Sequence, residues 1–145
     1  MSNIAPAVPA DLPGILDLLR QSDLPLAGVD AHLPTVLAAR DGARLTGCAA
    51  LELYGVAALL RSVAVASDRR GTGLGQRLTR AALDLARTRG VRTVYLLTTT
   101  AGEFFPRFGF QPITRDEIDP AVRQSVELTT ACPESALVMR LVLEP

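Results

Sequence analysis

A glycine-rich run of seven residues constrains this chain more than any other part of its sequence. The run is Arg69-Arg70-Gly71-Thr72-Gly73-Leu74-Gly75, and it follows a largely apolar stretch, 57–66, that predicts a covered strand. After the run, apolar residues recur with helical period at positions 74, 78, 81, 82 and 85. Glycines let the backbone approach a ligand closely, and a helix N-terminus presents unpaired N–H groups. A strand, a glycine loop and a helix in this order predict a cradle for a phosphate.

The sequence of this loop excludes two well-known phosphate-binding patterns. The P-loop GxxxxGK[ST] needs a lysine, and all fifteen basic residues of this chain are arginine. The Rossmann pattern GxGxxG needs a third glycine where the chain has Gln76 or Leu78. The charge pattern nevertheless fits an anion, because residues 61–92 contain eight arginines and two aspartates in a chain of zero formal net charge.

Composition places the chain among globular proteins and excludes several other classes. Its 145 residues are 48% apolar, which predicts a single folded domain over residues 1–145. One histidine and two distant cysteines argue against a metal centre and a disulfide framework. No apolar run is long enough to cross a membrane, and no secretory signal precedes Arg20, so we expect a cytoplasmic protein.

The remaining pattern predicts a meander of strands framed by helices. The expected strands cover 3–8, 35–40, 44–54, 57–66, 91–99 and 136–143, with a hairpin turn at Asp41-Gly42. Apolar residues at 12, 15, 16 and 19 predict a first helix capped by Asp11, and the second helix ends near Gly90. Shorter helices are expected at 29–33, 101–107 and 119–125, and the other residues are read as loops.

Two motifs resemble those of a known enzyme family. The stretch from Arg70 to Gly75 matches [QR]-x-x-G-x-[GA], the acyl-CoA signature of the GNAT superfamily of N-acetyltransferases. The stretch 98–110 resembles the pattern N-x-x-A-x-x-[FL]-Y-x-x-x-G-F, with Thr98 in place of the usual Asn and Phe105 in place of the usual Tyr. Within the superfamily, L-L-R-S-V-A-V at 59–65 and C-P-x-S-A at 132–136 resemble arsenic-resistance-associated acetyltransferases.

The resemblance implies an α/β fold and a binding mode for acetyl-CoA. The expected fold is a central mixed, mostly antiparallel sheet of about seven strands flanked by helices. The backbone of the loop would bind the CoA pyrophosphate, at Arg70, Gly71, Thr72, Gly73, Leu74 and Gly75. The preceding strand would pair with the pantetheine arm at Val63 and Val65. Arg107 would either reach the adenosine end or remain a solvent-exposed side chain. No metal is implied.

Acetyl transfer to an amine needs a base, and Glu52 is the best single candidate. It lies in mid-strand beside the strand that would hold the acyl chain, and burial would raise its pKa. The alternative is a solvent-facing carboxylate on an alternating strand. Tyr54 lies on the same face and is expected to assist, whereas Phe105 has no proton to give to the leaving thiolate.

Arg61 and Ser62 are the candidate substrate-binding residues. Strand alternation predicts that they point to opposite faces, with Arg61 on the face of Val63 and Val65. An arginine within an apolar strand needs an anionic partner, which is either a substrate carboxylate or an internal carboxylate such as Glu52. Cys132 is either a thiol contact for a soft substrate or an inert buried residue.

These observations predict an acetyltransferase that moves an acetyl group from acetyl-CoA to a primary amine of a small molecule. The subfamily resemblance adds an arsenic- or phosphinic-containing amino-acid analogue as acceptor, and therefore detoxification. A non-catalytic CoA-binding sensor or interaction module is the alternative, because of Phe105 and Thr98. Aromatic residues make up only 4% of the chain, so we expect no nucleic-acid partner, and no membrane partner either. Monomer and homodimer both stay open.

Overall fold

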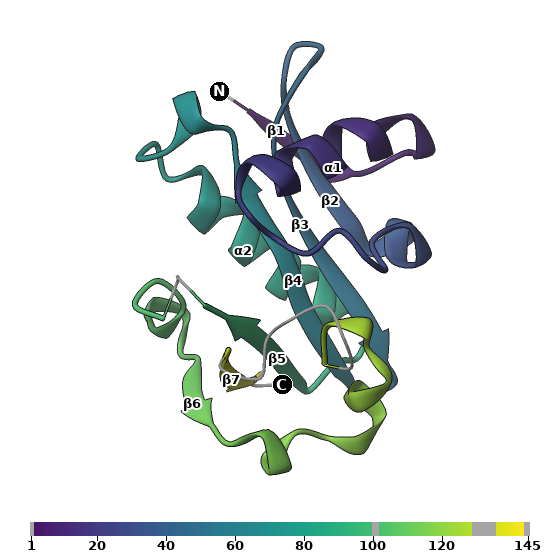
Figure 1. Cartoon of the computed structure of the whole chain (residues 1–145), viewed down its shortest axis with the longest axis vertical. Coiled ribbons are helices and arrows are strands. Elements are labelled where there is room, and N and C mark those ends of the chain that lie inside the picture. The colour runs from purple at the N-terminus through teal and green to yellow at the C-terminus, as the bar shows by residue number, and fades with distance from the viewer. Residues whose placement is uncertain (1, 100–101, 129–135, 144–145) are drawn as a thin grey trace.

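The fold is built on one mixed sheet of seven strands (Figure 1). The computed structural model describes residues 2–99, 102–128 and 136–143. The strand order is β1-β2-β3-β4-β5-β7-β6, and every neighbouring pair is antiparallel except β4 and β5, which are parallel. The strands are β1 (Asn3–Pro6), β2 (Val36–Asp41), β3 (Arg44–Tyr54), β4 (Ala57–Val65), β5 (Thr93–Thr98), β6 (Gln111–Ile113) and β7 (Leu137–Val142).

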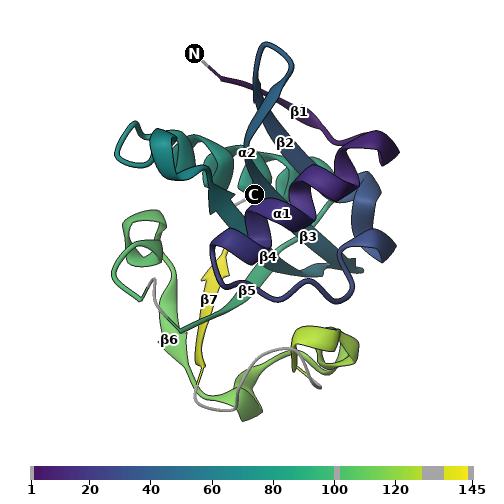
Figure 2. The ribbon, with the colours of Figure 1, turned by 45° about the horizontal axis from the view of Figure 1, so that its top comes forward.

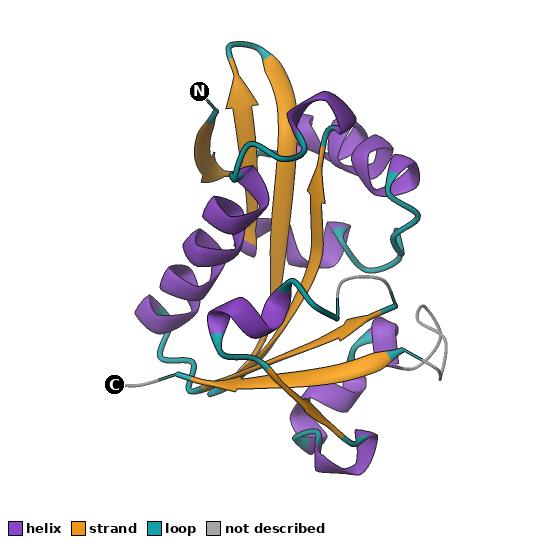
Figure 3. Ribbon diagram, turned by 90° about the vertical axis from the view of Figure 1, so that its left-hand side faces the viewer, coloured by secondary structure: helices purple, strands orange, loops and turns teal. Residues whose placement is uncertain are grey.

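Two helices cover opposite faces of the sheet (Figure 3). Helix α1 (Leu12–Gln21) buries Ile15, Leu18 and Leu19 in a core shared with Cys48 and Ala50 of β3. Helix α2 (Leu74–Thr88) packs on the other face, where its apolar residues meet the alternate residues of β3 and β4. Short 3-10 helices cover residues 9–11, 30–35, 67–69, 105–108, 115–117 and 120–124.

The structure confirms the expected fold class, a mostly antiparallel mixed sheet flanked by helices. Several local predictions differ from it. Strand β6 lies in a region read as a loop, because three residues that include Pro112 carry no strand pattern. The carboxylate of Asp11 accepts from the backbone N–H of Val8, ahead of the helix, and pairs with Arg40, so it caps no N–H of the first turn of α1.

Two of the expected short helices are also shorter than the pattern indicated, whereas the one expected at 29–33 is a 3-10 helix over Asp30–Thr35. In place of a helix over 101–107, the described part of this segment has a 3-10 helix at Phe105–Phe108. The segment 119–125 holds a 3-10 helix over Pro120–Gln124. Proline stands at the start of both, where its missing N–H costs little, and neither continues into a longer helix.

Strands β4 and β5 separate after a short region of pairing, and this separation positions the site. Their backbone pairing runs from Ala57–Thr93 to Leu59–Tyr95 only. Strand β5 then runs beside β7 at an angle to β2, β3 and β4, with β6 on the outside (Figure 2). Among the described residues, no strand pairs with β4 from Leu60 onward on its β5 side, so this edge of β4 lines an open space.

Candidate active site

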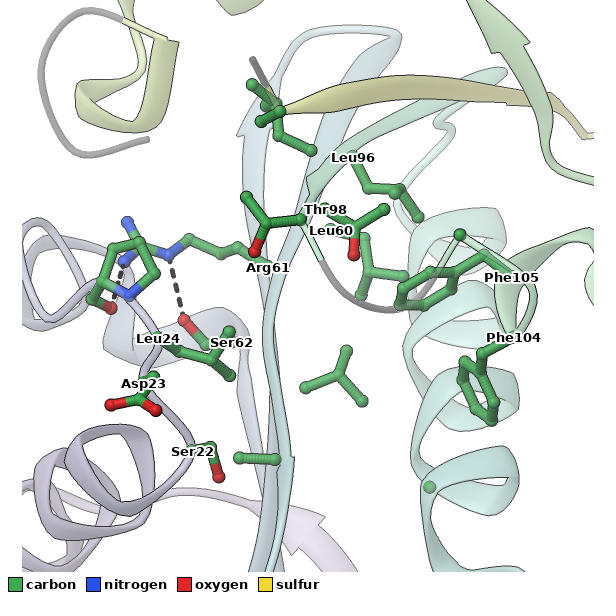
Figure 4. A pocket seen from close by; sticks show the side chains of 18 of the residues that line it. Ser22, Asp23, Leu24, Leu60, Arg61, Ser62, Leu96, Thr98, Phe104 and Phe105 are labelled. Atoms are coloured by element: carbon green, nitrogen blue, oxygen red, sulfur yellow. Dashed lines mark hydrogen bonds between the residues drawn. The ribbon is translucent and has the colours of Figure 1, made fainter. Parts of the chain in front are cut away.

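A cavity of about 1150 Å³ fills the wedge between β4 and β5. One wall is β4 from Leu60 to Val65, and the opposite wall combines β5 residues with Phe104 and Phe105 (Figure 4). The loop after α1 closes a third side with Ser22, Asp23, Leu24 and Pro25, and Arg70 and Gly75 mark the glycine-loop end. The cavity therefore joins the glycine loop to the buried polar residues of β4.

The glycine loop adopts the conformation that its sequence predicts. Gly71 and Gly73 have φ values of +78° and +85°, in the left-handed region that favours glycine, and Gly73 is the N-cap of α2. A Cβ at either position would meet no heavy atom within 4 Å. The need for glycine is therefore conformational, and the space above the loop is open beside the N–H groups of the first turn of α2.

A bulge in β4 changes which side chains share a face. Ala50 pairs with Arg61 and Cys48 with Ala64, so Ala49 faces both Ser62 and Val63. Ser62 adopts a φ of +61°, unusual for a residue with a side chain.

The predicted alternation through this part of β4 is wrong for that reason. Arg61 lies on the α1 face of the sheet, opposite Val63 and Val65, which pack against the α2 core. Arg61 and Ser62 lie together, because Arg61 Nε donates to Ser62 Oγ at 3.0 Å (Figure 4).

Arg61 is the centre of a buried polar network. Its side chain has no exposed surface; Nη1 donates to Glu52 Oε2 at 2.9 Å and Nη2 donates to the carbonyl of Pro25 at 3.1 Å. Arg61 Nε also lies 3.2 Å from Glu127 Oε2. The sequence left open whether the partner of Arg61 is a substrate carboxylate or an internal one. In the structure Arg61 has two internal carboxylate partners, Glu52 and Glu127.

Glu52 is fully buried, and its hydrogen-bond partners lower the pKa of its carboxyl. Burial raises the pKa of its carboxyl, but hydrogen bonds from Arg61, Ser125 and Tyr54 outweigh burial and hold that pKa below its usual range. The expectation that burial would raise the pKa of Glu52 is therefore wrong in its net direction. Tyr54 does share its face, and its hydroxyl donates to Glu52 Oε1 at 2.5 Å. His32 Nε2 lies 3.8 Å from the same oxygen.

Glu127 is a candidate functional residue that the sequence pattern did not reveal. Its side chain is 4% exposed and lines the cavity, whereas Glu52 lies behind the cavity wall. The residue follows a 3-10 helix in a segment without periodic pattern, far along the chain from Arg61. The available signal was a carboxylate between Val126 and Leu128, since an acid flanked by apolar residues is often buried against a cation.

The other residues singled out from the sequence lie on or near the cavity. Thr98 and Phe105 line it, and the Phe105 ring packs edge-on against Phe104 and Phe110. Arg107 is exposed, lines the cavity and lies over the Phe104 ring at 5.9 Å. Cys132 lies outside the described residues.

Within the described ranges, no group of three His, Cys, Asp or Glu side chains is arranged to hold a metal ion. Among the same residues, no helix has the length and apolar character needed to span a membrane.

Sequence comparisons place the chain beside known acetyltransferases. The model of the acetyltransferase (GNAT) domain matches residues 32–112. An uncharacterised N-acetyltransferase of Chlorobaculum tepidum is 30% identical over 114 residues, which cover 76% of this chain and 73% of the relative. Amino-acid acetyltransferases of two Neisseria meningitidis strains are 33% identical over 99 residues, which cover 67% of this chain and 22% of theirs. The chain thus spans about a fifth of the length of these two relatives.

Solved structures with the same fold include complexes with coenzyme A. The N-acetylglutamate synthase of Neisseria gonorrhoeae, solved with coenzyme A and N-acetyl-glutamate, has a TM-score of 0.86 at 24% identity over 100% of this chain and 36% of its own. A Mycobacterium tuberculosis protein solved with CoA has a TM-score of 0.81 at 21% identity, covering 98% of this chain and 99% of its own. At these identities the likeness establishes the fold.

Proposed function

This chain belongs to the GNAT family of acetyltransferases, and from that membership we propose that it transfers an acetyl group from acetyl-CoA to a primary amine of a small molecule. The observation that carries the proposal is the wedge between β4 and β5, which opens at one end onto the glycine loop and at the other onto the buried carboxylate of Glu127. Acetyl-CoA and an acceptor can therefore bind in the same cavity, each on its own side.

Acetyl-CoA is proposed to bind along the α2 side of the cavity. The left-handed Gly71 and Gly73 and the first turn of α2 fit the pyrophosphate, because backbone N–H groups and the helix N-terminus favour an anion. Val63 and Val65 lie on the unpaired edge of β4, where the amides of the pantetheine arm can add as a strand does. Arg70 and Arg107 are exposed arginines at this end and fit the phosphates or the adenosine.

The proposed chemistry is direct transfer. An ammonium group loses a proton, the amine nitrogen attacks the thioester carbonyl, and the carbon–sulfur bond breaks so that CoA leaves as a thiolate. The nitrogen then gives up its second proton, to the thiolate or to water, which leaves a neutral amide. We propose that the first proton enters the carboxylate pair of Glu52 and Glu127, which share the single guanidinium of Arg61. Glu52 remains the proposed base, and Glu127 is the member that meets the cavity. A thiol has an ordinary pKa of about 8.5, so the thiolate can leave near neutral pH without the hydroxyl that Phe105 lacks.

The acceptor is proposed to contact Arg61, Ser62 and the loop after α1, which wall the far side of the cavity. The amine of an amino-acid-like compound fits this side in charge, because the carboxylate of Glu127 lines it. As a finer proposal, the acceptor is an arsenic- or phosphinic-containing amino-acid analogue, which would give the protein a role in detoxification. This proposal rests on the resemblance of the motifs at 59–65 and 132–136.

Release of CoA thiol tests the function directly. The protein is incubated with acetyl-CoA and a panel of amines, including amino acids and their arsenical and phosphinic analogues. We expect acetyl-CoA to raise the melting temperature and at least one amine to accelerate thiol release. Stabilisation by acetyl-CoA without thiol release for any amine would favour the non-catalytic CoA-binding module.

A further inference from the structure

We propose that Glu127 is a specificity-determining residue, which makes the cavity select acceptors without net negative charge. The inference rests on the acetyl transfer proposed above and concerns the acceptor side of the same cavity. It follows from the way charge is distributed between the two sides.

The acceptor side carries more carboxylates than cations. Glu52 and Glu127 both pair with Arg61, and Asp23 lies at the rim of the same side. Among the described cavity-lining residues on this side, Arg61 is the one arginine. The undescribed ranges do not alter this inventory, since 1, 100–101, 129–135 and 144–145 contain no Arg or Lys. His32 faces Glu52 at 3.8 Å, and a protonated imidazole there would offset part of the excess.

Burial strengthens the electrostatic effect of this excess of negative charge. The side chains of Arg61, Glu52 and Glu127 are at most 4% exposed, so water screens their charges poorly. Three of the atoms of the Arg61 guanidinium group, Nε, Nη1 and Nη2, already donate to or contact Ser62, Glu52, Glu127 and Pro25. The single positive charge of Arg61 is shared by Glu127 and Glu52. An acidic group of a ligand beside Glu127 is therefore repelled, whereas an ammonium group is attracted.

The opposite side carries an excess of positive charge, with two lining arginines, Arg70 and Arg107, and one lining acid, Glu103, among the described residues. Neither arginine forms an ion pair with any described residue. Anionic acetyl-CoA therefore fits the arginine-lined side, and a neutral or cationic acceptor fits the carboxylate-lined side. An anionic acceptor would be repelled from the carboxylate-lined side, and acetyl-CoA occupies the other. The geometry points to glutamine-like rather than glutamate-like amines.

Matched pairs of amino acids test this selection by binding. Glutamate and glutamine, and aspartate and asparagine, have nearly the same shape and differ by one negative charge. Calorimetric titration into the protein saturated with CoA, at pH 8, measures acceptor affinity without turnover. We expect the amide to bind about tenfold more tightly than the acid in each pair.

The variant Glu127→Gln links that preference to one residue. It keeps the shape of the side chain and leaves Arg61 paired with Glu52, and we expect the amide preference to shrink to about threefold or less. Glu117→Gln is the control, because Glu117 is an exposed carboxylate on the same segment, 46% exposed and outside the cavity lining. The control should keep the tenfold preference.

Three results would overturn the inference: wild type binding the acids as tightly as the amides, binding of no member of either pair, or an unchanged preference in Glu127→Gln. Failure of the proposed function is recognised separately, because it abolishes thiol release while the order of affinities stands. An acidic arsenical or phosphinic analogue carries a negative charge as glutamate does, so this inference and that finer acceptor proposal exclude each other. Tight binding of such an analogue would overturn the charge selection and favour the finer proposal.

Discussion

Replacing Arg61 with methionine tests the buried polar network on the acceptor side of the cavity. Methionine keeps most of the apolar stem and removes the guanidinium that pairs with Glu52 at 2.9 Å and Glu127 at 3.2 Å. Removing one partner of a buried ion pair costs about 3–5 kcal/mol, because an uncompensated charge stays in the interior. For a domain of this length, that loss lowers the melting temperature by roughly 6–20 °C.

The pH dependence of this variant follows from the groups left behind. In the wild type the pKa of Glu52 is lower in the folded state than in the unfolded chain. The ionised carboxylate therefore contributes its full stabilisation of the fold above the unfolded pKa, and this contribution is lost as the pH falls through the folded pKa. In Arg61→Met the hydrogen bonds from Ser125 and Tyr54 remain, but the guanidinium is lost, so we expect burial to raise the pKa of Glu52 above its unfolded value. The folded variant then binds more protons than the unfolded chain, so its stability should increase as the pH falls from 8 to 5.

Thermal unfolding at pH 8 and pH 5 measures both effects. Arg20→Met is the matched control, because Arg20 is 59% exposed and forms a surface pair with Asp17, which contributes about 1 kcal/mol or less. If Arg61→Met melted within 2 °C of this control at pH 8, or if its deficit were the same at pH 5, the buried network would not have the role given to it.

Three further predictions address the base, the loop and the buried thiol. Glu52→Gln removes proton acceptance, and we expect turnover at pH 7 to fall by ~10²-fold or more and to recover partly as the pH rises; wild-type turnover across pH 6–9 would exclude Glu52 as the base. Gly73→Val should abolish acetyl-CoA binding in calorimetry, because valine resists the φ of +85°, while Gly73→Asn, which tolerates that conformation, should retain part of the affinity. Burial raises the pKa of the Cys48 thiol to about 12, so in a Cys132→Ser background a thiol reagent should label native protein slowly at pH 8 and denatured protein fast; equal rates would refute the burial.

The glycine loop and its flanking elements could be predicted from sequence because local rules determine them. An apolar strand, left-handed glycines and an amphipathic helix each follow from residues close in sequence, and α2 begins at the predicted Leu74. The bulge at Ser62 could not be predicted in this way. Alternation assumes a regular strand, and one extra residue in β4 reverses the face of every side chain beyond it.

The acceptor side of the cavity was only partly predictable for a different reason. Glu52 and Arg61 lie on neighbouring strands of one meander, so their pairing could be listed among the alternatives from the sequence alone. Glu127 reaches Arg61 from a segment whose path is set by tertiary packing, and no local pattern encodes that path. Conversely, Asp11 has the residue type and position of a helix cap, yet Val8 and Arg40 compete successfully for its carboxylate.

The contacts of Arg61 also have a consequence for the order in which the chain assembles. Its partners include Pro25, 36 residues away in sequence, and Glu127, which is farther still along the chain. Long-range contacts of this kind form after loop closure, whereas the β3–β4 hairpin and α2 depend on local contacts. The contacts of Arg61 with Pro25 and Glu127 should therefore be largely absent from the folding transition state, whereas its pair with Glu52 lies within the β3–β4 hairpin. Breaking the two distant contacts should accelerate unfolding and leave the folding rate nearly unchanged, so they would also determine how long the native state persists.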